Sequence, residues 1–415
     1  MPQTVLREGM TSADRTVEPG TAVKARTPEE RQRRLAPARR RLAQGRVLFV
    51  RLFDQRGRID RGLTVGMGLL VGVICVLGIP ELRPYFPAGI DLEIPLRAAS
   101  HWASGGQAYP PSAMQVQNGP DLPYLYPPFL LPMLAPIAAL PRDIVTGLWL
   151  LLCCLCAVWT CRRLAIPWLA IAFVLAWPPF AEGLLTGNVQ ILGFAAFVAL
   201  LYERADGRLR QRTFLPAHDA LNGVLVGAVG VLKVAQLLSA VYLARRRFQA
   251  AVIGLGTLAV LVIVMLPLTG IAIYGDYLAQ LQRATDPAWT IGGVAIGRLL
   301  GLPDVVPMAV GVAMALSVRG RDSAAWLGIA LLIATPSAHG YTFLFLLPGL
   351  LTIRRDIAIP IAALFIGVYR ATDWWIACGL VIVLLIAMTR WPWLRVAESA
   401  RLDERPPALA AEATA

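Results

Sequence analysis

Asp91 has the surroundings in this sequence that best suit proton transfer. It lies in the segment GIDLEIPLRAASHWASGGQAYPP and is followed by Glu93, Arg97 and His101. If residues 91–104 form a helix, Arg97 and His101 share one face and Asp91 can serve as the N-cap. The functional alternative is a carboxylate that accepts the proton of an attacking hydroxyl group. Both interpretations stay open on the sequence alone.

Cationic residues near apolar runs are candidates for binding a phosphate. Lys233 is one of two lysines in the chain and lies within the apolar run 220–244. An ionisable side chain there points to function, and a cation suits a phosphate oxygen. The structural alternative is a lysine that extends to the membrane surface. Arg283 and Arg298, in the polar segment 271–304, are further phosphate candidates, although many surface loops have this composition.

Amides, a histidine and tyrosines complete the polar set. Asn188 and Gln190 stand two positions apart at the start of an apolar run, where they can bind a hydroxylated ligand or tie helices together. His339 follows another apolar run, either as a satisfied boundary residue or as a ligand contact. Tyr124 and Tyr126 fit an aromatic belt at a membrane interface, although aromatic faces also bind sugars.

Signatures of nucleotide and metal chemistry are missing from the sequence. There is no Walker A motif, no GxGxxG after a strand, no zinc-ligand spacing and no Asp-x-Asp pair. The six cysteines lie in apolar runs, where we expect small buried side chains. We therefore expect no metal and no cofactor.

The composition is typical of a membrane protein. Hydrophobic residues make up 57% and charged residues 16% of the chain, whereas soluble chains are about 45–50% apolar and about 25% charged. The net charge of +13 does not indicate nucleic acid, because the basic residues concentrate in the first 62 positions and in short links between apolar runs. That distribution is the positive-inside pattern.

We predict an all-α fold, a transmembrane bundle of about twelve helices. The apolar runs are 63–80, 144–161, 164–180, 184–202, 220–244, 249–268, 305–318, 325–337, 340–353, 357–369 and 373–389. The basic links share one side only if run 220–244 is a hairpin that reverses near Lys233. Residues 1–60 and 391–415 are then cytoplasmic tails of a membrane domain at 61–390.

The polar candidates then fall on the extracytoplasmic side of the inner membrane. A large first outer loop, 81–143, contains Asp91 and a short apolar stretch, 127–140, that suits an interfacial helix. We expect one site there, with substrate contacts from several loops: Glu93, His101, Tyr124, Tyr126, Asn188, Gln190, His339 and Tyr341.

The order of these segments resembles the GT-C superfamily and, more narrowly, glycosyltransferase family eighty-seven. The segments are the Asp91 motif, YLYPPFLLPMLAPIAALP, GNVQIL, GVLVGAVGVLKVAQLL and TPSAHGYTFLFLLPGLL. This family includes mannosyltransferases and related arabinosyltransferases that use polyprenyl-phosphate sugars.

The resemblance implies a donor, an acceptor and three residue roles. A hexose such as mannose would pass, with inversion, from a polyprenyl-phosphate donor to a glycolipid or glycan acceptor. Asp91 would be the catalytic base, Lys233 would lie near the donor phosphate, and Tyr126 would shape the lipid-side wall. The alternatives are a transporter or lipid flippase and a scaffolding membrane protein.

Overall fold

A computed structural model describes ten segments of the chain: 88–116, 121–166, 168–205, 208–211, 219–232, 237–284, 295–318, 322–336, 338–353 and 371–390. They belong to one compact unit, Phe53–Ala415. The apolar runs 63–80 and 357–369, the tails 1–60 and 391–415, and Lys233 lie outside the described residues.

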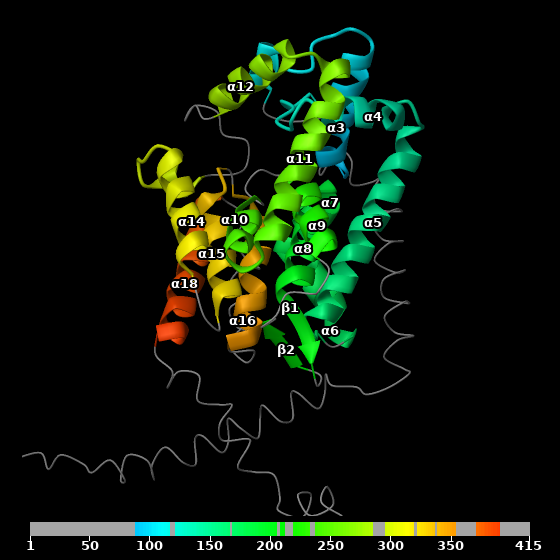
Figure 1. The fold of residues 1–415 in the computed structure, drawn as a ribbon. Helices are drawn as coiled ribbons and strands as arrows, with labels where there is room; N and C mark the ends of the chain where they lie inside the picture. Colours follow the sequence, from blue (N-terminus) through cyan, green and yellow to red (C-terminus); the bar gives the residue numbers. More distant parts are fainter. Residues whose placement is uncertain are drawn as a thin grey trace, which may run out of the picture. The chain divides into compact units, whose positions relative to one another are not determined.

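The described residues are mostly helical (Figure 1). In chain order the elements are α3 (Ile90–Ala103), η1 (Pro111–Gln115), α4 (Leu130–Ala138), α5 (Arg142–Arg163), α6 (Trp168–Ala176), α7 (Pro178–Thr186), α8 (Gln190–Leu201), β1 (Tyr202–Ala205), β2 (Arg208–Gln211), α9 (Asp219–Leu232), α10 (Leu238–Arg246), α11 (Phe248–Thr269), α12 (Ala272–Ala284), α13 (Ile296–Leu299), α14 (Val305–Ser317), α15 (Ser323–Ala334), η3 (Gly340–Leu346), α16 (Leu347–Ile353) and α18 (Ala371–Arg390). The antiparallel hairpin β1–β2 departs from the all-α prediction; it forms in a stretch that we expected to be a basic loop.

Two described helices, α5 and α11, are long and apolar enough to cross a membrane. Leu255 and Ile263 of α11 are exposed, and an apolar surface of this kind suits lipid better than water. The predicted run 164–180 is wrong as a single span, because α6 ends before Pro178, which begins α7. The structure therefore does not establish about twelve membrane helices.

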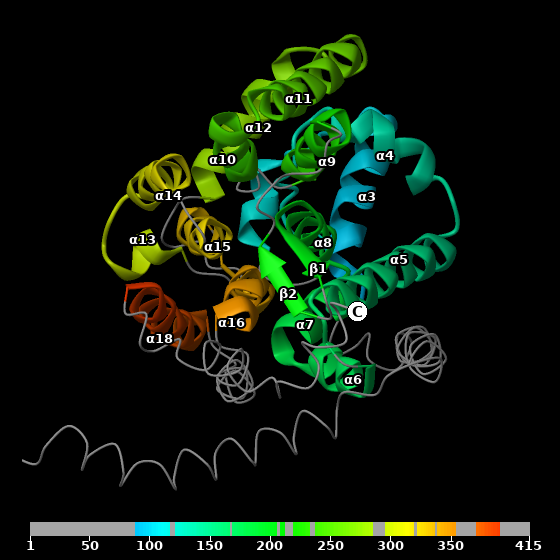
Figure 2. The same cartoon turned by 60° about the horizontal axis from the view of Figure 1, so that its bottom comes forward.

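Helices α9 and α11 pack closely through glycines (Figure 2). A Cβ atom on Gly223 would lie 2.7 Å from the carbonyl oxygen of Ala250, and one on Gly227 would lie 2.7 Å from that of Gly254. Gly223 contacts Ala250 and Gly227, one turn later, contacts Gly254. Because the residue numbers at the contacts rise in the same direction on both helices, α9 and α11 run parallel. Parallel neighbours require the chain to return between them, and α10 lies between them in the sequence. The predicted reversal near Lys233 lies outside the described residues and stays a prediction.

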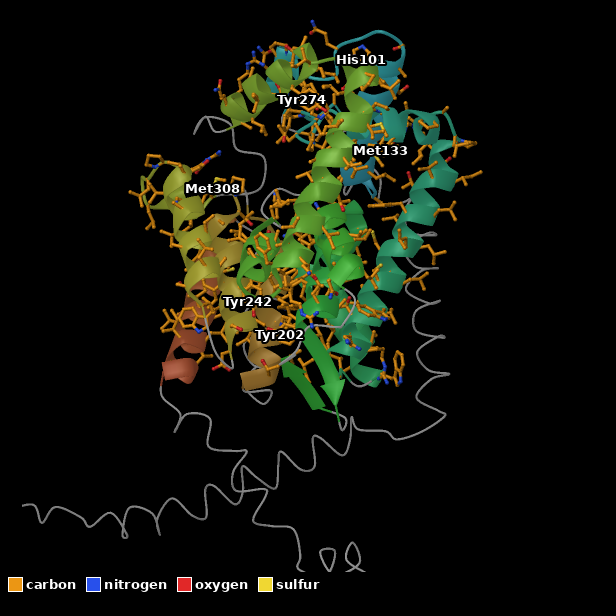
Figure 3. The ribbon with its side chains drawn as sticks, in the orientation of Figure 1. His101, Met133, Tyr202, Tyr242, Tyr274 and Met308 are labelled. Carbon is orange, nitrogen blue, oxygen red and sulfur yellow. The ribbon has the colours of Figure 1, made fainter. Side chains whose placement is uncertain are left out.

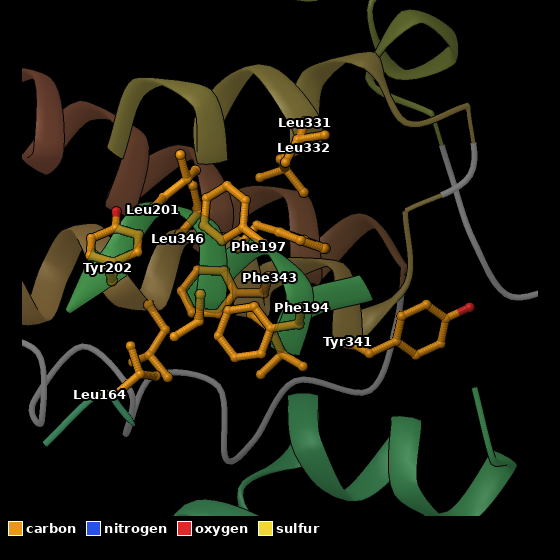
Figure 4. Close-up of a cluster of buried hydrophobic side chains, with 14 of the residues drawn as sticks. Leu164, Phe194, Phe197, Leu201, Tyr202, Leu331, Leu332, Tyr341, Phe343 and Leu346 are labelled. Atoms are coloured by element: carbon orange, nitrogen blue, oxygen red, sulfur yellow. The ribbon is translucent and has the colours of Figure 1, made fainter. Parts of the chain in front are cut away.

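Aromatic rings connect several elements within the larger hydrophobic core (Figure 4). Phe345 of η3 meets Phe194 and Phe197 of α8 edge to face, with ring centroids 5.6 and 5.2 Å apart. In Figure 4, Tyr202 and Tyr341 lie at opposite ends of the cluster, and the Tyr341 hydroxyl points away from it. The core thus fixes η3 and α8, and the Tyr341 hydroxyl lies at one edge of it.

A second hydrophobic cluster joins α3 to its neighbours. Its buried members include Leu92, Leu96, Tyr109 and Tyr124, and Trp149 of α5 packs against both this cluster and the larger core. Helix α4 packs on α3, which places a helix where sequence 127–140 predicted one. Its predicted place at the membrane interface stays a prediction.

The glycine contact predicts opposite effects of two similar substitutions. Gly223→Ala should lower the melting temperature of the detergent-solubilised protein, because overpacking against a backbone carbonyl costs about 1–3 kcal/mol. Gly256→Ala, on α11 with nothing within 4 Å of its Cβ position, should leave the melting temperature unchanged or raise it, since helix propensity favours Ala by about 1 kcal/mol. A rise for both would show that α9 and α11 are not in close contact.

Candidate active site

Asp91 lies in the first turn of α3, where the helix dipole favours a negative charge. The N-cap position belongs to Gly89, whose N–H donates to Leu185 of α7 at 2.8 Å and whose φ is 76°. A Cβ on Gly89 would lie 2.5 Å from Thr146 Cγ2, so only glycine fits. The N-cap role considered for Asp91 is therefore wrong, because its carboxylate points to another segment.

The Asp91 carboxylate accepts a hydrogen bond from the side-chain amide of Asn188. Its Nδ2 donates to Asp91 Oδ2 at 2.8 Å, across 97 positions of sequence. Its Oδ1 accepts the backbone N–H of Gln190 at 2.8 Å. Because the oxygen end of the amide is taken by a backbone donor, the nitrogen end must face the carboxylate.

A glycine turn positions Asn188. Gly187 ends α7 with φ 68°, and the N–H of Asn188 donates to Gly183 at 2.8 Å, which is the Schellman arrangement. Trp149 Nε1 donates to the Gly187 carbonyl at 2.7 Å. The side chain that joins the two hydrophobic clusters therefore also holds the turn in place.

Tyr126 and Tyr341 surround the same carboxylate. Burial and, secondarily, the negative charge of Asp91 raise the pKa of Tyr126, so its hydroxyl stays protonated. The buried Tyr341 hydroxyl faces Asp91, Glu182 and Tyr126, and Asn188 is its hydrogen-bond partner. Residues from α3, the 121–129 loop, the α7–α8 turn and η3 thus meet at one place.

A carboxylate–histidine pair borders this place. Glu182 Oε1 lies 3.8 Å from His339 Nδ1, and the His339 ring stacks on Tyr341 with centroids 5.1 Å apart and planes at 15°. Glu182 was absent from the predicted site. An acidic residue within the apolar sequence around α7 was the available signal.

Four tyrosine rings extend the site away from Asp91. Centroids are 5.7 Å apart for Tyr126 and Tyr124, 5.3 Å for Tyr124 and Tyr109, and 5.6 Å for Tyr109 and Tyr277. We call these four residues the tyrosine row. Tyr109 and Tyr277 were not predicted, because nothing local in the sequence connects α12 to the first loop.

Two predicted contacts lie elsewhere on α3. Glu93 pairs with the exposed Arg97 at 2.9 Å, and His101 Nδ1 contacts the Gln107 carbonyl at 3.1 Å. His101 is ten residues beyond Asp91, about 15 Å along a helix; Figure 3 labels it at the same end as Tyr274. The structure therefore brings Asp91, Asn188, Tyr126 and Tyr341 together and places Glu93 and His101 in other contacts; that the predicted residues form one substrate site stays a prediction.

The remaining predicted residues have mixed surroundings. The Gln190 side chain is buried, and its Oε1 has no hydrogen-bond partner among the described residues. Arg298 pairs with Asp304 at 3.4 Å and donates to the Ala284 carbonyl at 2.8 Å, and the exposed Arg283 faces Gln280. The predicted phosphate role of both arginines stays a prediction.

Where the chain is described, no three His, Cys, Asp or Glu side chains are grouped as metal ligands would be.

A carboxylate held by an amide, beside aromatic rings and tyrosine hydroxyls, can accept a proton from a hydroxylated ligand. The chain matches glycosyltransferase family 87 over residues 124–350, more than half of its 415 residues. It belongs to this family and is a glycosyltransferase, as the sequence resemblance implied. Glycosyltransferases of this family are membrane proteins, in agreement with the apolar helices α5 and α11. No curated protein and no solved structure matches the chain.

The Asn188 amide bonds both Asp91 and the backbone of Gln190, so its replacement by alanine should lower activity. Asn188→Ala removes the donor to Asp91, and we expect kcat for sugar transfer to fall about tenfold or more, equivalent to about 1.4 kcal/mol. Asn222→Ala, which removes another buried amide from α9, is the matched control and should cost stability without lowering kcat. Equal kcat values for the two variants would argue against a positioning role for Asn188.

Proposed function

We propose that the chain transfers a hexose, with mannose as the first candidate, from a polyprenyl-phosphate donor to a hydroxyl of a glycolipid or glycan acceptor. The transfer takes place on the extracytoplasmic side of the inner membrane and inverts the anomeric centre. Asp91 is the general base. The observation that carries this proposal is the contact of Asp91 with Asn188 inside a half-buried site.

The surroundings of Asp91 support its role as base. A carboxylate that leaves water needs hydrogen-bond donors to remain charged, and the amide of Asn188 supplies one. The protonated hydroxyls of Tyr126 and Tyr341 lie nearby, so the site stabilises a negative charge while its ring faces can accommodate a sugar. Asn188, Tyr126 and Tyr341 all fall within the family match at 124–350.

The reaction follows from this arrangement as one displacement. The acceptor oxygen attacks the anomeric carbon of the donor while its proton passes to the Asp91 carboxylate. The bond between the anomeric carbon and the phosphate oxygen breaks, and its electron pair leaves with polyprenyl phosphate. Because the attack and the departure occur on opposite faces, a β-linked donor gives an α-linked product.

The leaving phosphate requires a cation. Lys233 is the first candidate, as the family resemblance implies; it follows Leu232, the last residue of α9, in the sequence. Arg283 and Arg298 are the other candidates, but Arg298 is already paired with Asp304.

A lipid-linked donor agrees with the surface of the protein. Exposed apolar side chains cover α11 and α14, for example Ile263 at 66% and Val305 at 67% exposure. A polyprenyl chain and membrane lipids would cover such surfaces, whereas a soluble nucleotide sugar would not.

Replacement of the proposed base provides the central test. Asp91→Asn should lower transfer from a radiolabelled polyprenyl-phosphate hexose by about 100- to 10,000-fold, the usual contribution of general base catalysis, without loss of expression. Asp121→Asn is the matched control, since Asp121 is an exposed carboxylate paired with Arg97, and should keep its activity. Full transfer by Asp91→Asn would remove Asp91 from this role, and translocation of the donor without transfer would favour a transporter.

A second substitution tests the proposed phosphate contact. Lys233→Ala should raise the KM for the polyprenyl-phosphate donor about tenfold or more, because a charge-assisted hydrogen bond contributes about 1.5–3 kcal/mol. The KM for the acceptor should not change. Lys24→Ala, which replaces the other lysine, serves as the control. An unchanged donor KM in Lys233→Ala would contradict the assignment.

A further inference from the structure

One side of α12, which contains Tyr274, Tyr277 and Gln280, is called its inner face; two of its polar atoms form no hydrogen bond with any described residue. Tyr274 Oη and Gln280 Nε2 are covered by neighbouring atoms and, within the described segments, have no hydrogen-bond partner. Gln280 has 0% exposure. Tyr274, Tyr277 and Gln280 follow one another at intervals of three, so they share one side of the helix. Buried polar atoms without partners are rare in native proteins, and each requires an explanation.

This face of α12 continues the tyrosine row that ends beside Asp91. Tyr277 belongs to the row, and Tyr274, one helical turn before it, is near enough to help raise the pKa of Tyr109. The hydroxyls of Tyr109 and Tyr124 are already used, because they donate to the backbone oxygens of Tyr126 at 2.7 Å and Pro127 at 3.2 Å. Tyr274 and Gln280 therefore offer hydrogen-bonding capacity that these row members lack.

The row carries no charge at neutral pH. Burial raises the pKa of Tyr277 to about 12 and the pKa values of Tyr109 and Tyr124 above their ordinary value, so their hydroxyls stay protonated. Neutral rings with hydroxyl and amide groups suit a neutral sugar, whereas a phosphate requires cations or several N–H donors. The tyrosine row therefore fits a sugar ring better than a phosphate, although the exposed Arg283 of α12 donates to Gln280 Oε1 at 3.4 Å.

We propose that the inner face of α12 binds a neutral sugar of the acceptor, with hydrogen bonds to its hydroxyl groups from Tyr274 Oη and Gln280 Nε2. The inference rests on the proposed function, since the attacking hydroxyl of the same acceptor lies at Asp91. Three ring-to-ring steps of 5.3 to 5.7 Å separate Tyr126 from Tyr277. Because Asp91 lies beside Tyr126, at the other end of this row from Tyr277, α12 recognises a second sugar, beyond the one that is glycosylated.

Access to the covered atoms requires α12 to move, and the chain has a suitable joint. Gly270, between α11 and α12, has φ 71° and ψ 163°, a combination that only glycine adopts readily. No atom lies within 4 Å of its Cβ position. Rotation at Gly270 would uncover the two atoms and would separate Tyr277 of α12 from Tyr109.

Two substitutions test the subsite with defined acceptors, octyl dimannoside and octyl mannoside. Tyr274→Phe and Gln280→Leu should each raise the KM for the dimannoside about three- to tenfold, the effect of one hydrogen bond. The KM for the monomannoside, the KM for the donor and kcat should not change. The melting temperature of Tyr274→Phe should stay level or rise, because an unpaired buried polar atom has been removed. Gln280→Leu also removes the Oε1 atom that accepts from Arg283 at 3.4 Å, so its melting temperature should stay level or fall slightly.

Matched substitutions separate this result from general damage. Tyr242→Phe removes a hydroxyl that bonds Ser323 at 2.7 Å in another part of the core, and should lower the melting temperature without changing the dimannoside KM. Gln282→Leu replaces an exposed glutamine of α12 and should also leave that KM unchanged. If Tyr274→Phe and Gln280→Leu leave the dimannoside KM unchanged, or raise both acceptor KM values equally, the subsite is overturned.

Binding measurements distinguish failure of the subsite from failure of the proposed function. Octyl dimannoside is titrated calorimetrically into Asp91→Asn protein with and without Tyr274→Phe. Weaker binding in the double variant supports the subsite even if the unsubstituted protein transfers no sugar, in which case the proposed reaction alone fails. Equal binding by both proteins contradicts the subsite even if transfer by the unsubstituted protein is normal.

Discussion

The side-chain amide of Asn188 has both of its ends engaged, and the arrangement of the site depends on this. One end accepts a backbone N–H at the start of α8, and the other donates to Asp91 of α3. A carboxylate withdrawn from water is stable only with such donors. The left-handed turn at Gly187 is what allows the amide to make both bonds. The position of the proposed base is thus determined by a helix ending far away in the sequence.

The site lies where two hydrophobic clusters meet. The larger core fixes η3 and α8 through aromatic edge-to-face contacts, and the smaller one fixes α3 and the first loop. Trp149 packs against both clusters and holds the Gly187 turn by a hydrogen bond. Side chains at this junction are packed by apolar residues from two sides, while their polar ends contact one another.

Local features of the site were predictable from the sequence, whereas its long-range contacts were not. The helix that contains Asp91 and the helix start at Gln190 follow from local apolar patterns and charge placement. The pairing of Tyr109 with Tyr277 joins segments without any shared pattern, and Glu182 becomes informative only beside His339. Proline placement explains the division of run 164–180, which hydropathy alone did not reveal.

The pairing of Asp91 with Asn188 also constrains the order in which the protein can mature. The two residues are 97 positions apart, and Tyr341 is made later than both. A growing chain that has exposed α3 therefore carries an unprotected carboxylate until α7 and α8 are in place, and it lacks the Tyr341 hydroxyl until η3 has been synthesised. Contacts between distant segments form late because the chain entropy of closing long loops opposes them. The site is consequently among the last parts of the molecule to be completed, and chains released before η3 is synthesised would lack part of it.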